Sequence, residues 1–153
     1  MAKAIDIYNY GRKLDSTLEK VKTSSISKKN KKLIEEFSNF CFASSISKPR
    51  VIKYMRTLRQ LAEWLQVDFD KAQKSDIERV VTVIQRNENY TEWTKTDFNI
   101  VLKRFYKWMN GLEDYPECVK WLKTRPNKSK MTLPGQDGLL TEDDIKKLIN
   151  ASD

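Results

Sequence analysis

The stretch of residues 47–66 constrains the fold more than any other part of the chain. Its apolar residues recur at steps of three and four positions, which is the period of one face of an α-helix: Val51, Met55, Leu58, Ala62 and Leu65. Ser47 is placed to accept a backbone N–H as the N-cap, and Pro49 is tolerated in the first turn because its missing donor would be unpaired there. The sequence therefore predicts an amphipathic helix that buries one face in a core.

The opposite side of the same helix is cationic and polar. Its residues are Arg50, Lys53, Arg56, Thr57 and Gln60, with Lys48 in the first turn. A row of cations along a helix can lie against a phosphate backbone. Charged faces are also common as simply solvated surfaces. Taken alone, this helix leaves both interpretations open.

Residues 94–109 repeat the pattern. The predicted apolar stripe is Phe98, Val101, Leu102, Phe105, Trp108 and Met109. We expect the other side to carry Thr96, Asn99, Lys103 and Lys107, with Lys95 and Arg104 on the flanks. Thr94 and Asp97 have the spacing of a capping box, and Gly111 is expected to end the helix. Two basic helices of this kind predict a shared surface whose cations contact phosphates, with Thr57, Gln60, Thr96 and Asn99 nearer the base edges.

Other stretches also have helical periodicity. Helices are predicted over about residues 7–21, 28–43 and 75–87, the last with Ser75 and Glu78 as a capping box, and a short one near Pro116. Four lysines in the first turn of the 28–43 helix are either a solvated run or a phosphate contact, and the sequence does not decide between them. Gly and Pro are scarce, at four each. These features predict an all-α domain.

The pattern changes after residue 124. Residues 125–140 combine prolines, glycines and cations, including Lys128 and Lys130, and are typical of a basic linker. Residues 141–153 then begin with the N-cap residue Thr141 and carry a small apolar face. We expect this segment to be the first helix of a second domain, and residues 1–26 to be an extension before a main domain at 27–124.

Composition narrows the classes of function. The formal net charge of +8 favours an anionic partner. The chain has no histidine, which excludes His-based triads and His-ligated zinc within it, and it shows no Gly-rich phosphate loop. Cys41 and Cys118 lack a metal-binding spacing and are expected to be reduced thiols of a cytoplasmic protein. We expect no catalytic residue, cofactor, metal, membrane or small-molecule substrate for this chain.

An ordered set of segments resembles the N-terminal core-binding domain of tyrosine recombinases, the phage integrase family, and especially its archaeal members. The set comprises KPRVIKYMRTLRQLAEWLQ, which includes Tyr54, then Ser75-Asp76-Ile77, Leu102-x-x-Phe105-Tyr106-x-Trp108 and Leu140-Thr141-Glu142. The resemblance covers about residues 28–150. It implies a four-helix, SAM-like orthogonal bundle that forms half of a clamp around double-stranded DNA, with its second and fourth helices facing the duplex. It also implies that the partners of the parent protein are its own catalytic domain and sister protomers.

The expected function is therefore duplex DNA binding in site-specific recombination or integration. The family's catalytic residues cannot be placed here, because a chain without histidine cannot contain the His-x-x-Arg element. The expected DNA contacts are Lys48, Arg50, Lys53, Arg56, Thr57, Gln60, Lys95, Thr96, Asn99, Lys103, Arg104, Lys107, Lys128 and Lys130. One alternative is a free-standing helical DNA-binding regulator. Another is a helical protein–protein adaptor.

Overall fold

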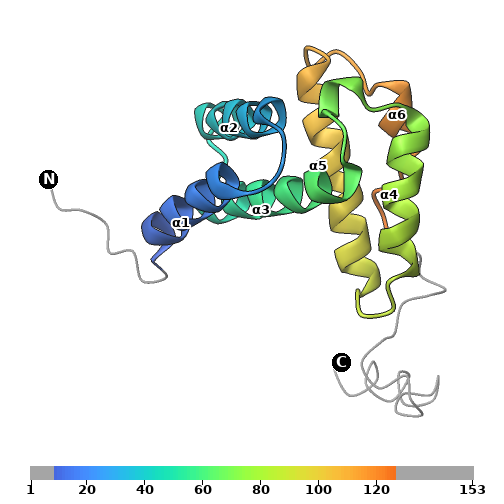
Figure 1. The fold of residues 1–153 in the computed structure, drawn as a ribbon, viewed down its shortest axis with the longest axis horizontal. Coiled ribbons are helices and arrows are strands. Elements are labelled where there is room, and N and C mark those ends of the chain that lie inside the picture. The colour runs from blue at the N-terminus through green and yellow to red at the C-terminus, as the bar shows by residue number, and fades with distance from the viewer. Residues whose placement is uncertain (1–8, 127–153) are drawn as a thin grey trace, which may run out of the picture.

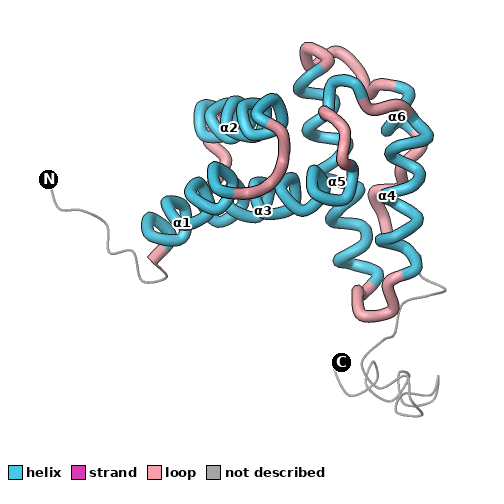
Figure 2. Tube along the Cα trace, viewed as in Figure 1, coloured by secondary structure: helices cyan, strands magenta, loops and turns pink. Residues whose placement is uncertain are grey.

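The computed structural model describes residues 9–126, and this part of the chain is helical with no β-strand (Figures 1 and 2). The predicted all-α fold is confirmed. The elements are α1 (Tyr10–Thr23), α2 (Lys28–Ala43), α3 (Lys48–Leu65), the 3₁₀ helix η1 (Phe69–Lys71), α4 (Lys74–Arg86), α5 (Glu92–Met109) and α6 (Glu117–Lys120). Most of the predicted linker and the whole predicted last helix lie outside the described residues. None of the described helices combines the length and apolar character that a membrane span requires.

Helix α3 is the central element, in contact with α1, α2, α4 and α5. Figure 1 shows α1 and α2 on one side of the molecule and the α4–α5 pair on the other, with α3 running from the first group to the second. The first turns of α1 and α3 line one pocket, and the segment after α1 lines another with the end of α3. Because the two helix starts lie together and the two helix ends lie together, α1 and α3 run side by side in the same direction.

The core confirms the apolar stripe predicted for α3. All five stripe residues are buried, and Val51 and Leu58 have no exposed surface at all. Aromatic rings from three elements meet beside them: Phe105 lies 5.3 Å from Phe37 and 4.7 Å from Phe69 between ring centroids. Burial on this scale stabilises the fold by about 1.5–3 kcal/mol for each large apolar side chain.

Two predicted helix starts and one predicted capping hydrogen bond need correction. Helix α5 begins before Thr94, because Thr91 is the N-cap and its hydroxyl accepts the Thr94 N–H at 3.2 Å. Helix α4 begins after Gln73, whose backbone N–H donates to Asp76 at 2.9 Å, so the capping box is not the predicted Ser75–Glu78 pair. Ser47 is the N-cap of α3, but its side chain makes no capping hydrogen bond.

The end of α5 agrees with the prediction. Gly111 adopts a positive φ of 75°, which costs glycine little because it has no Cβ. The Gly111 N–H donates to the Trp108 carbonyl at 3.1 Å, and the Leu112 N–H donates to the Lys107 carbonyl at 2.9 Å. This is the Schellman pattern of helix termination. The chain reverses here, and the segment after the turn returns to pack on α5 through α6.

The first-turn lysines of α2 contact protein groups at the surface. Lys31 Nζ donates to the Lys22 carbonyl at 2.8 Å, Lys29 lies 3.8 Å from Asp70, and Lys32 lies 3.9 Å from Glu36. Exposed pairs of this kind contribute at most about 1 kcal/mol each. The contacts are those of a solvated charged turn, and they leave a phosphate contact untested.

Candidate nucleic-acid interface

The outward side of α3 carries the predicted row of cations. Lys48, Arg50, Lys53 and Arg56 are exposed, and Thr57 and Gln60 beside them are partly exposed. Lys53 is held by Asp97 of α5, at 2.8 Å between Nζ and Oδ2. The side chains of Lys48, Arg50 and Arg56 make no hydrogen bond or ion pair with any other described residue. The positive charge on this side of α3 is therefore largely uncompensated by the rest of the described fold.

The polar side of α5 is partly covered by the rest of the fold. The prediction that this side is exposed is wrong for Lys95, Thr96 and Asn99. All three are buried, at 9 %, 5 % and 6 % exposure. The Thr96 hydroxyl donates to the Glu92 carbonyl of its own helix at 2.8 Å. Lys95 Nζ donates to the Gln85 carbonyl in the last turn of α4 at 2.9 Å and lies 3.6 Å from the Glu92 carboxylate. Its charge therefore joins the end of α4 to the start of α5.

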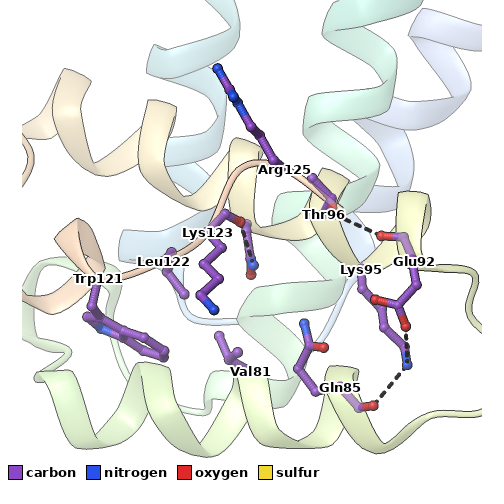
Figure 3. A pocket seen from close by; sticks show the side chains of 10 residues that line it. Val81, Gln85, Glu92, Lys95, Thr96, Trp121, Leu122, Lys123 and Arg125 are labelled. Atoms are coloured by element: carbon purple, nitrogen blue, oxygen red, sulfur yellow. Dashed lines mark hydrogen bonds and ion pairs between the residues drawn. The ribbon is translucent and has the colours of Figure 1, made fainter. Parts of the chain in front are cut away.

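Asn99 joins α5 to the segment that comes after α6. Its Nδ2 donates to the Lys123 carbonyl at 2.9 Å, while its buried Oδ1 has no hydrogen-bond partner. A pocket of about 240 Å³ lies here. Figure 3 shows Trp121 and Lys123 on one side of this pocket and Lys95 and Glu92 on the other. A buried oxygen beside a pocket of this size is satisfied most simply by an ordered water.

Lys103 and Lys107 are drawn toward the returning chain. Their Nζ atoms lie 4.5 Å and 5.1 Å from the centroid of the Tyr115 ring, which is the geometry of cation–π contacts. Lys103 also donates to the Leu122 carbonyl at 3.3 Å. Both side chains are partly buried. These two cations therefore contribute to the intramolecular packing of α5 as well as to the surface charge.

Arg104 points toward α3. Its guanidinium donates to the Tyr54 hydroxyl and lies over the Tyr54 ring, 5.9 Å from the centroid. The same guanidinium acts on Cys41 of α2. Burial raises the pKa of the Cys41 thiol to about 11, and the charge of Arg104 opposes that rise. Arg104 thus lies where α2, α3 and α5 meet.

Tyr106 is poorly placed to act as a nucleophile. The Tyr106 hydroxyl is buried and donates to the Phe69 carbonyl at 2.8 Å. Burial raises the pKa of Tyr106 far above its ordinary value, and the nearby Cys118 and carboxylates raise it further. A nucleophile needs a lowered pKa or an adjacent base. Residues 9–126 also contain no cluster of three or more Cys, Asp or Glu side chains able to hold a metal ion.

Sequence reasoning missed the contribution of two segments to these surfaces. Tyr10 and Lys13 of α1 line a pocket with the cationic side of α3. Lys123 and Arg125 line the pocket beside Asn99. The only sequence signal for Lys13, Lys123 and Arg125 was their positive charge, which many other positions share. Lys128 and Lys130, also predicted as DNA contacts, lie outside the described residues.

In comparisons with known proteins, no family model, curated protein or solved structure matches the chain.

Proposed function

We propose that this chain binds double-stranded DNA as the core-binding half-clamp of a site-specific tyrosine recombinase or integrase. The observation that supports the proposal best is the row of exposed cations on α3, of which Lys48, Arg50 and Arg56 have no partner among the described residues. The net charge of +8 adds a long-range attraction for a polyanion. The recombinase assignment rests on the sequence resemblance alone.

The geometry of α3 suits a duplex. Its polar face repeats in each turn, and successive turns are about 5 Å apart. The residues on this face are Arg50, Lys53, Arg56, Thr57 and Gln60. An α-helix fits into the major groove of B-DNA, which is about 12 Å wide. In such a placement the cations reach phosphates, while Thr57 and Gln60 reach base edges.

Helix α5 takes a smaller part than its sequence suggests. Lys95, Thr96 and Asn99 are buried within the fold, and Lys103 and Lys107 lie on Tyr115. We therefore infer that α3 supplies most of the phosphate contacts. A half-clamp with few such contacts binds its duplex weakly and with a modest salt dependence.

One feature favours the alternative of a free-standing DNA-binding regulator. Residues 44–47 join α2 to α3 as a short turn, with Ser45 at a φ of 63°, which resembles the turn of a helix-turn-helix motif. In that case α3 would be the recognition helix. The parent gene beyond the Asp153 codon separates the two proposals: codons for a basic domain with a nucleophilic tyrosine support the recombinase, and a stop codon supports the regulator.

The test of the proposed function is a salt series. The 153-residue chain is titrated against a random-sequence duplex by fluorescence anisotropy at increasing salt. We expect log K to fall linearly with log salt, at about 0.9 per neutralised phosphate. An affinity that does not change with salt contradicts the proposal.

A matched pair of variants locates the contact. Arg56→Ala should weaken binding and lower the salt slope by about 1. Lys74→Ala removes the same charge from α4, where Lys74 lies 3.9 Å from Glu78, and should leave the slope unchanged. Equal losses in the two variants would show that only the net charge matters.

A further inference from the structure

Helix α1 lies outside the recombinase resemblance, yet the structure makes it part of the bundle. Thr17 and Val21 are buried, and Leu14 and Leu18 pack against the core. Helix α1 packs against α3, the helix with the row of exposed cations. The position of α1 is therefore fixed relative to the proposed DNA-binding surface.

The junction of α1 and α3 forms a small cationic pocket. It has a volume of about 220 Å³ and is lined by Tyr10, Lys13, Pro49, Ile52, Lys53, Arg56 and Thr57. Three of these side chains are cations, and none is a carboxylate. Like charges gathered around one concavity repel each other unless an anion joins them. The lining is therefore complementary to a negatively charged group.

The three cations of the pocket have different intramolecular partners. Lys13 lies 5.4 Å from the centroid of the Tyr10 ring, on α1. Lys53 is bonded to Asp97, and Arg56 has no partner among the described residues. An arginine fork can grip two oxygens of one phosphate, while a lysine adds a point charge. The Thr57 hydroxyl supplies a further donor, and Pro49 and Ile52 form an apolar wall.

We propose that this pocket holds a backbone phosphate of the bound duplex, with Lys13 of α1 and Arg56 of α3 as its two principal contacts. The inference rests on the proposed function and extends it, because it makes α1 part of the DNA-binding surface. A phosphodiester fits the lining: its charge meets the cations, and its oxygens accept from the guanidinium and the hydroxyl.

The test compares two lysines of α1 in the full chain. Lys13→Ala removes the cation in the pocket, and Lys20→Ala removes an exposed cation from the last turn of the same helix, outside the pocket lining. Anisotropy titrations with a random-sequence duplex are repeated across the salt series. We expect Lys13→Ala to lower the salt slope by about 0.9 and to weaken binding roughly three- to tenfold at moderate salt. Lys20→Ala should leave the slope at the wild-type value.

Two further arms keep the outcome clear. Lys13→Arg keeps the charge and should restore the slope, and thermal unfolding by circular dichroism checks that each variant folds. Equal slopes for Lys13→Ala and Lys20→Ala, with salt-dependent binding by the wild-type chain, overturn the α1 contact and leave the proposed function standing. A wild-type affinity that is flat with salt overturns the proposed function itself. The last arm titrates the chain with inorganic phosphate alone and follows the NMR shifts of Lys13. Saturating shifts, together with a duplex affinity that added phosphate does not change, would identify a site for free anions. That result would also overturn the inference.

Discussion

Helices α3 and α5 are alike in sequence and different in use. Both have 18 residues, both bury a broad apolar stripe, and both carry cations on the remaining surface. On α3, Lys48, Arg50, Lys53 and Arg56 are exposed, and the Arg56 side chain has no partner among the described residues. On α5, Lys95 and Asn99 are buried, and Lys103 contacts the chain that returns after the helix.

For Asn99 and Lys103 the difference comes from the segment that follows each helix in the chain, whereas Lys95 is held by α4, which precedes α5. After α5 the Gly111 turn sends the chain back along the helix, and residues 112–125 contact its polar side. After α3, Phe69 of η1 enters the core and α4 packs against α3. Arg79 of α4 donates to the last two carbonyls of α3. Helical periodicity identifies the main core face, but it does not show whether a later segment covers the other face.

The largest effect is expected when one lysine on each helix is replaced, to compare the buried Lys95 of α5 with the exposed Lys53 of α3. Lys95→Met keeps the apolar stem but leaves the Gln85 carbonyl and the Glu92 carboxylate without the ammonium that they contact. Removing one partner of a buried polar contact costs about 1–3 kcal/mol. We expect a loss of that size in the free energy of unfolding, measured by urea denaturation followed by circular dichroism.

The matched control is Lys53→Met on α3. Lys53 and Asp97 form a half-exposed ion pair, and such a pair contributes about 0.2–1 kcal/mol to the free energy of unfolding. Equal losses for Lys95→Met and Lys53→Met would contradict the distinction between a structural cation on α5 and a surface cation on α3.

A pH series examines Cys41, the buried thiol of α2 near the exposed Arg104 of α5. The Cys41 thiol has a pKa raised from 9.0 to about 11 by burial, with Arg104 opposing the rise. Above pH 9 the thiol ionises in the unfolded chain but not in the folded one, so its contribution to stability is complete below pH 9 and is lost as the pH rises toward 11. We expect roughly 1 kcal/mol less stability at pH 10 than at pH 8 from this group.

The measurement compares urea denaturation of the wild-type chain with that of Cys41→Ala across this range. The other titrating groups are common to both proteins, so the difference in slope reports on Cys41. Parallel pH dependences would show that Cys41 is not protected from ionisation in the folded chain.

The smallest expected effect concerns the contact between the two helices. Asp97 of α5 neutralises Lys53 of α3, at 2.8 Å. In the proposed complex the DNA phosphates compete with this carboxylate for the lysine. Asp97→Asn should therefore raise duplex affinity by roughly two- to fivefold, a fraction of a kcal/mol of the kind expected for an exposed pair. Glu78→Gln, which removes an acid paired with Lys74 on α4, serves as the control and should have no effect. Unchanged affinity in Asp97→Asn would place Lys53 away from the DNA.

Local sequence accounted for the positions of the helices better than for their starts. The 28–43 helix and the apolar stripe of α3 could be predicted from periodicity, because a buried stripe repeats in every turn. The N-caps of α4 and α5 could not, because several Ser, Thr and Asp residues near each start can serve. Thr91 caps α5 where Thr94 was expected, and the choice depends on where the tertiary structure lets the chain enter the helix.

The sequence by itself determined that residues 9–126 fold as an all-α domain, and that the chain is strongly basic and without histidine chemistry. Those properties depend on residue type and on spacing within one element. Only the tertiary structure decided which cations are available to a partner. That availability depends on segments far apart in the chain: Lys123 approaches Asn99, Tyr115 approaches Lys103, and Lys13 reaches the cationic side of α3. The physical reason is that a charge is free to bind DNA only where the rest of the fold neither buries nor neutralises it.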